Sequence, residues 1–203
     1  MDGTTLVETL TDDLETELSR LGSSKWLYAL TDGEMTGDAV RSAAATDAAA
    51  AAERFEAWAA NDNAATATFD ALTATATDRA ETVDADPAGT PDAERTYAAL
   101  AEFDDAVGRL GGALGHSLVL DRTVGQMVGF FVGDADPSTA GTFRDLRDEL
   151  NADRDRILDG LDETCDGDDW DRAAAAARTV VDAAYDDYVN ILESMGIKPK
   201  NVC

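Results

Sequence analysis

The chain has 203 residues, of which 42 are aspartate or glutamate and 16 are lysine or arginine, so its formal net charge is −26. A chain of this length can bury a full hydrophobic core as one domain without disulfides or metals. Its two cysteines, Cys165 and Cys203, are too few for a disulfide framework. It has no run of about 20 apolar residues that could span a bilayer. The acidic start leads us to expect a cytoplasmic protein without a signal peptide.

The acidic excess predicts a protein from an extreme halophile. At about 1 M salt the Debye length is roughly 3 Å, so the repulsion among carboxylates is screened. At low salt the same charge destabilises the compact state. The charge therefore indicates a habitat, and it neither supports nor excludes a nucleic-acid partner.

Apolar residues recur at helical spacing along most of the chain, and no stretch alternates convincingly at period two. The first expected helix begins near Thr5, because Thr5 and Glu8 have the spacing of a capping box, and it ends at Gly22. Three further helices are expected before the first long loop, over residues 25–30, about 36–60 and 64–83.

The segment 84–92 is the clearest loop, and within it Thr90 and Pro91 signal the start of another helix. We expect that helix to continue through Tyr97 into a glycine-rich stretch at 106–133. Two more helices follow, one from Asp136–Pro137 and one with a heptad seam over 170–195. The sequence therefore predicts an all-α bundle of about six helices in a single domain over 1–203. Its parts are N-terminal helices at 1–83, the loop at 84–92, central and C-terminal helices at 93–195 and a tail at 196–203.

The stretch 106–133 is predicted to be the central helix, or two end-to-end helices. Glycine inside a helix costs roughly 0.5–1 kcal/mol relative to alanine, so several together need a structural reason. Two sets recur every fourth residue and form smooth strips on one helix face: Gly111 and Gly115, and Gly125, Gly129 and Gly133. We expect the strips to serve close helix packing or self-association, the second together with Phe130 and Phe131.

Residues with evident catalytic or metal-binding chemistry are few. His116 is the only histidine, and no Glu-x-x-His motif supplies the paired ligands of a di-iron bundle. Aspartate pairs such as Asp104–Asp105 lack the further aspartate of a diphosphate-binding motif, and a solvated helix face explains them. Cys165 lies among acidic residues, which raise the pKa of a thiol and lower its reactivity. No GxSxG, phosphate-binding loop or dinucleotide fingerprint occurs.

Segments 38–60 and 64–83 resemble the first helical pair of rubrerythrin-like members of the ferritin-like superfamily. Aligned on Phe55, the first family ligand position falls on Ala48. Aligned on Phe69 and Ala80, the family's Glu-x-x-His falls on the positions of two residues that cannot bind iron: Ala76 and Arg79. The resemblance implies a ferritin-like bundle that has lost its di-iron centre. The chain is also similar to haloarchaeal proteins described as rubrerythrin-like or as transcription antitermination factors.

Three functions stay open. The preferred one is a non-catalytic, self-associating bundle that acts as an interaction or scaffold protein, with no catalytic residue, metal or cofactor. The second is a rubrerythrin-type oxidoreductase or iron-handling protein with an atypical carboxylate site. Its candidate ligands are Glu53, Glu81, Glu102, Glu149 and His116. The third is a binder of a lipophilic small molecule between the helices.

Overall fold

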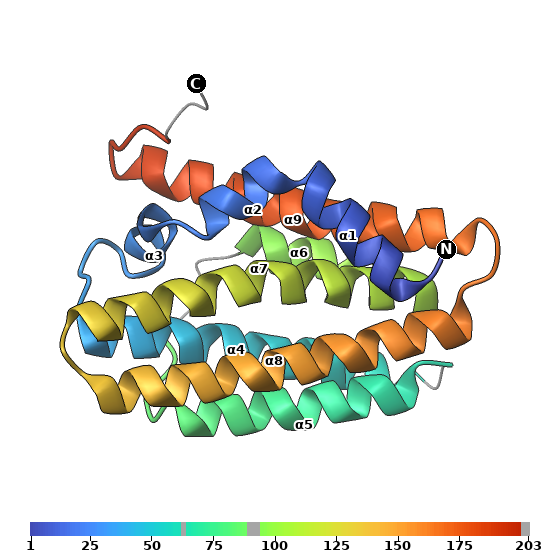
Figure 1. Cartoon of the computed structure of the whole chain (residues 1–203), viewed down its shortest axis with the longest axis horizontal. Helices are drawn as coiled ribbons and strands as arrows, with labels where there is room; N and C mark the ends of the chain where they lie inside the picture. The colour runs from blue at the N-terminus through green and yellow to red at the C-terminus, as the bar shows by residue number, and fades with distance from the viewer. Residues whose placement is uncertain (62–63, 89–93, 200–203) are drawn as a thin grey trace.

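The computed structural model of the protein describes residues 1–61, 64–88 and 94–199. Within these residues the chain forms nine α-helices and no strand, which confirms the all-α class; the expected number of about six helices was too low. Among the described residues, five long helices lie along the long axis of the molecule (Figure 1). They are α4 (Gly37–Ala59), α5 (Thr66–Thr82), α7 (Ala106–Gly133), α8 (Pro137–Thr164) and α9 (Asp169–Ser194). None of the helices in the described residues is long and apolar enough to cross a membrane.

The first four of these helices form two antiparallel hairpins, α4–α5 and α7–α8, as the colour gradient of Figure 1 shows. Helix α5 also packs against α8, and α6 (Glu94–Ala101) lies on the path between the hairpins. The last helix, α9 (Asp169–Ser194), packs along α7 and α6. Three short helices cover the bundle from the side of α9: α1 (Gly3–Asp13), α2 (Glu15–Leu21) and α3 (Ser24–Leu30).

Helix α7 is the centre of the fold and spans the whole stretch that the sequence indicated, as one continuous helix. Asp105 caps its start by accepting a hydrogen bond from the backbone N–H of Gly108 at 2.9 Å. Every residue from 110 to 120 is buried, which explains why this part of the helix is uncharged on all faces. α7 thus lies between α8 on one side and α9 on the other.

The first glycine strip packs against another helix, as expected. A Cβ added to Gly111 would lie 2.4 Å from the backbone oxygen of Ala173, and one added to Gly115 would lie 2.4 Å from that of Ala177. The four residues form matching small-residue strips on α7 and α9. Their backbones approach each other more closely than any side chain at these glycines would allow.

The second strip does not pack against any of the described residues, so its expected role in close helix packing was wrong. Among residues 1–61, 64–88 and 94–199, a Cβ at Gly129 or Gly133 would have no neighbour within 4 Å, and one at Gly125 would meet the guanidinium of Arg147 at 3.8 Å. Beside this strip, Phe131 is buried and stacks on Phe143 with ring centroids 5.1 Å apart, whereas Phe130 is partly exposed. A role of this face in self-association stays a prediction.

The first expected helix is two helices, which break at Leu14. Asp2, and not Thr5, is the N-cap, and it accepts a hydrogen bond from the Thr5 N–H at 2.8 Å. The leucines between 6 and 18 recur every fourth residue, which drifts about 40° per step around a straight helix. The break resets this drift, so that Leu6, Leu10, Leu14 and Leu18 are all buried.

The helix expected to run through Tyr97 into the central stretch is also interrupted. α6 ends at Ala101 and α7 begins at Ala106, because the Asp105 side chain caps a new helix start. The helix-start signal at Thr90–Pro91 and the cysteine at 203 lie outside the described residues.

Candidate functional site

A cavity of about 420 Å³ lies between α4 and α7, with parts of α3, α5, α6 and α8 completing its wall. Helix α4 packs closely along α5 but touches α7 at few points, and the space between α4 and α7 remains open. The reason lies in the sequence of α4, which is nearly all alanine from 43 to 52. Alanine side chains such as Ala44 and Ala48 line the cavity and are too short to fill it.

Most of the cavity wall is apolar. Leu120, Val124 and Met127 project from α7, and Phe143 and Leu146 project from α8. All five side chains are at most 8% exposed, so they form a well-ordered surface that belongs to the core. A wall of this kind favours an apolar ligand or an apolar part of one.

One end of the cavity holds three polar side chains, Asp47, Tyr97 and His116, which we term the inner polar cluster. The Tyr97 hydroxyl donates to Asp47 Oδ1 at 2.8 Å, and its oxygen lies 3.3 Å from His116 Nε2. His116 Nε2 also lies 3.3 Å from Asp47 Oδ1. The inner polar cluster thus takes one residue from each of three helices, α4, α6 and α7.

The surroundings of the inner polar cluster set the charge of its members. Burial alone would raise the pKa of Asp47, but His116, the Tyr97 hydrogen bond and the charge of Arg79 together hold that pKa below its ordinary value. Burial, and then the charge of Asp47, raise the pKa of Tyr97 well above 10. At neutral pH Asp47 is therefore an anion and Tyr97 a neutral hydrogen-bond donor.

A carboxylate from α9 holds Tyr97 in place. Asp187 accepts hydrogen bonds from the backbone N–H groups of Arg95 and Thr96 at 3.2 and 3.0 Å, and from the Thr96 hydroxyl at 2.9 Å. These bonds fix the first turn of α6, and Tyr97 follows directly in the sequence. Burial raises the pKa of Asp187, although the same hydrogen bonds oppose that rise.

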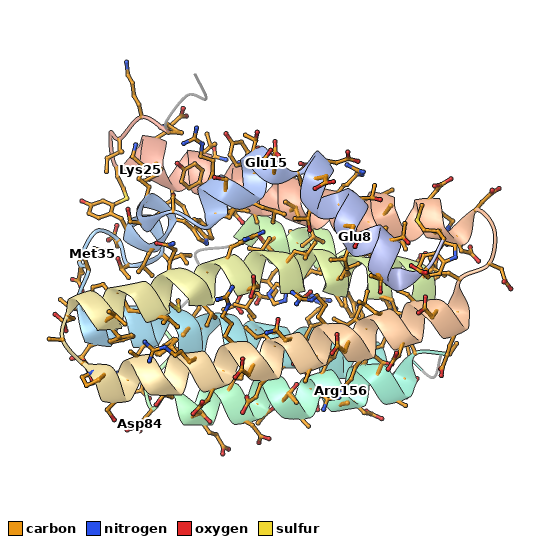
Figure 2. All side chains as sticks on the ribbon, viewed as in Figure 1. Glu8, Glu15, Lys25, Met35, Asp84 and Arg156 are labelled. Carbon is orange, nitrogen blue, oxygen red and sulfur yellow. The ribbon has the colours of Figure 1, made fainter. Side chains whose placement is uncertain are left out.

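A buried ion pair lies beside the inner polar cluster. Arg79 Nη1 on α5 donates to Asp153 Oδ2 on α8 at 2.6 Å, and both side chains are at most 6% exposed. Asp153 also accepts bonds from Arg156 at 2.7 Å and from the Thr75 hydroxyl at 2.8 Å. Arg156, labelled in Figure 2 between α8 and α5, is half exposed. The charge of Asp153 is thus fully engaged by protein groups.

Most other polar groups of the wall are also satisfied by the protein. The Thr123 hydroxyl accepts from Trp26 Nε1 at 3.0 Å, and the Thr46 hydroxyl accepts from the Ala88 N–H at 2.8 Å. Within the described residues, two buried side-chain atoms of the wall have no hydrogen-bond partner, Asp47 Oδ2 and Arg79 Nε. Such atoms are rare in folded proteins and call for an explanation.

The outer end of the cavity is acidic. Asp32, Glu34 and Asp38 line it and are exposed. They belong to the connection from α3 to α4 and to the first turn of α4. Figure 2 labels Met35 in this connection and Asp84 just after α5, and both lie at the left end of the bundle.

The four glutamates considered as metal ligands do not converge. Glu53, Glu81, Glu102 and Glu149 are all exposed. No group of three or more side chains that could hold a metal ion occurs in the described part of the chain. His116, in contrast, is buried 3.3 Å from the Asp47 carboxylate.

The three positions that the resemblance marked lie in the interior. Ala48 and Arg79 line the cavity, and Ala76 is fully buried. Sequence analysis missed Asp47 and Tyr97. Asp47 could have been noticed as the one charged residue inside the alanine run of α4, but nothing in the sequence pairs it with Tyr97. Comparisons of the chain with protein-family models, curated proteins and solved structures found no match.

Proposed function

We propose that the protein binds a small, mainly apolar molecule in the cavity between α4 and α7. The observation that carries the proposal is the cavity itself, about 420 Å³ in volume, with an apolar wall and one polar end. This volume lies within the range of about 300–1,000 Å³ that is usual for small-molecule sites. Far smaller apolar cavities, of about 150 Å³, already bind benzene.

Burial of ligand surface supplies the binding energy. Apolar surface transferred from water gains about 25 cal/mol per Å². The wall is ready to receive it, because Leu120, Val124 and Phe143 are held in the core by their own neighbours. Little side-chain freedom is then lost on binding, which favours affinity.

The two other functions considered from the sequence have less support. The oxidoreductase hypothesis relied on four exposed glutamates, of which three lie on different helices and Glu102 lies just after α6. A scaffold role would use the open face of Gly129 and Gly133, where Val132 is 55% exposed. The two antiparallel hairpins, joined in the sequence through α6, support kinship with the ferritin-like superfamily. We keep this kinship as part of the proposal.

Calorimetric titration with 1-octanol tests the proposal. We expect saturable binding of one molecule per chain and a rise in the thermal midpoint, because a ligand that binds only the folded state stabilises it. The Ala44→Phe variant fills the cavity from α4, and we expect it to abolish binding while the protein stays folded.

Ala57→Phe is the matched control, since Ala57 is exposed on the same helix and does not line the cavity. It should bind 1-octanol as the parent does. Failure of 1-octanol and of its charged eight-carbon analogues to bind saturably, or equal binding of 1-octanol by Ala44→Phe and the parent, would exclude the cavity as the site.

A further inference from the structure

We infer that the ligand is an amphipathic amine, whose ammonium group lies against Asp47 while its apolar part fills the cavity. This inference rests on the proposed function and names the ligand class for the same site. It follows from the charges at three places around the cavity: the carboxylate at the inner end, the buried ion pair beside it and the acidic entrance.

The inner end offers an anionic acceptor. Asp47 Oδ1 is occupied by Tyr97 and His116, whereas Oδ2 is buried without a hydrogen-bond partner among the described residues. An ammonium group has only donors, and its bond to a carboxylate is among the stronger hydrogen bonds in proteins. A neutral hydroxyl head gains a weaker bond, and a carboxylate head brings a second negative charge to Asp47.

The nearby arginine does not reverse this preference. Arg79 contributes a positive charge to the wall, but its Nη1 is already bonded to Asp153 at 2.6 Å. Arg79 Nε has no hydrogen-bond partner among the described residues, so an acceptor on a ligand could bond to it without displacing Asp153. If that acceptor were anionic, its negative charge would be repelled by the carboxylates of Asp47 and Asp153.

The negative charge at the entrance of the cavity also favours a cationic ligand. Asp32, Glu34 and Asp38 line the outer end, and Arg41, bonded to Asp38, offsets part of their charge. A cleft lined by one sign of charge concentrates ligands of the opposite sign and repels those of the same sign. Cations therefore meet favourable charge at both ends of the cavity.

Three probes with the same alkyl chain test the ligand class: octylamine, 1-octanol and octanoate. In calorimetric titrations at neutral pH, we expect octylamine to bind at least about tenfold more tightly than 1-octanol, and octanoate to bind most weakly. If none of the probes binds, the proposed function itself fails. If 1-octanol binds and octylamine binds no more tightly, only the amine inference is overturned.

The variant Asp47→Asn tests the assigned residue. It should lower the affinity for octylamine at least about tenfold and change that for 1-octanol by less than about twofold. Asp145→Asn, an exposed change on α8 away from the cavity, controls for net charge and should leave both affinities unchanged. If the ratio of the octylamine affinity to the 1-octanol affinity is the same in Asp47→Asn as in the parent, the role of Asp47 is refuted.

A second measurement needs no variant and holds even if Asp47→Asn does not fold. His116 is the only histidine, so its imidazole nitrogens give one assignable pair of NMR signals. Because His116 contacts Asp47, an ammonium group at Asp47 should move these signals during the octylamine titration. Octylamine that binds without moving them would place its head elsewhere and contradict the inference.

Discussion

Asp47 is a partly exposed carboxylate at the cavity and Asp153 is a buried one between α5 and α8, and their partners give them different roles. Asp153 binds two arginines and a threonine hydroxyl, so both of its oxygens are engaged by the protein. Asp47 has partners for one side-chain oxygen and none for the other within the described residues. Asp153 therefore joins α5 to α8, whereas Asp47 retains an acceptor for a ligand.

Removal of Arg79 should destabilise the protein strongly. Arg79→Leu deletes the buried partner of Asp153, and breaking a buried pair typically costs about 3–5 kcal/mol. Arg147→Leu is the control, because Arg147 is half exposed in its pair with Asp121 and such pairs contribute about 0–1 kcal/mol. Denaturant unfolding gives both values, and equal losses would contradict a structural role for the buried pair.

Cys165 should react slowly with alkylating reagents. Burial, and then the charge of Asp169, raise its pKa to about 11, so only about 0.1% is thiolate at pH 8. In a Cys203→Ser background, the rate of alkylation by iodoacetamide should rise about tenfold per pH unit between about pH 8 and 10. The urea-unfolded chain is the control and should level off near an ordinary thiol pKa. A plateau at that same pH in the folded protein would disprove the shift.

At the scale of single helices, the two glycine strips of α7 differ in whether another helix packs against them. A Cβ at Gly115 would lie 2.4 Å from the Ala177 oxygen, whereas a Cβ at Gly129 would meet nothing within 4 Å in the part of the chain that the structure describes. The same spacing of four residues therefore marks a helix contact in one half of α7 and an open face in the other. Spacing alone predicts a smooth strip and does not say whether another helix covers it.

Alanine substitutions should separate the two strips. Gly115→Ala must force α7 away from α9, and overpacking of this kind costs about 1–3 kcal/mol. Gly129→Ala should stabilise the protein by about 0.5–1 kcal/mol, because alanine is the better helix former and has room. Thermal unfolding of both variants decides the matter, and a stable Gly115→Ala protein would contradict the close approach.

Local signals in the sequence predicted most helices, and tertiary contacts account for the rest. The glycine-rich stretch 106–133 as a central helix and the start of α8 at Asp136–Pro137 were predicted from apolar periodicity and helix-start residues. The helix start at Ala106 was missed, because the preceding helix was expected to continue into this stretch. The break at Leu14 depends on how apolar faces meet other helices, which the local pattern does not contain. The break after Ala101 follows from the Asp105 cap, a local signal that the sequence analysis did not use. The candidate site was the least predictable part, because Asp47, Tyr97 and His116 come together only through packing of three helices.

At the scale of the whole molecule, the net charge of −26 is spread over a surface with few basic partners. Arg172 contacts Asp105 and Asp169, and Arg178 contacts Asp13, but exposed pairs of this kind contribute little. Most of the carboxylates therefore repel one another in the folded state, and we propose that the protein is adapted to high salt.

The protein should be more stable in concentrated salt. Circular dichroism in about 0.1 M and about 3 M KCl should show a higher thermal midpoint at the higher concentration, because screening removes the repulsion among surface carboxylates. The Arg79–Asp153 pair should depend little on salt, since buried pairs are weakly screened. Equal midpoints in the two solutions would contradict the proposed adaptation.

Binding in the cavity between α4 and α7 is the central claim, and a crystal structure with 8-bromooctylamine tests it most directly. The bromine atom locates the ligand by its anomalous signal. We predict one bromine peak per chain inside the cavity, near Leu120 and Phe143, with the amine in contact with Asp47. Bromine peaks only on the outer surface of the bundle, or none at all from crystals soaked to saturation, would contradict the account.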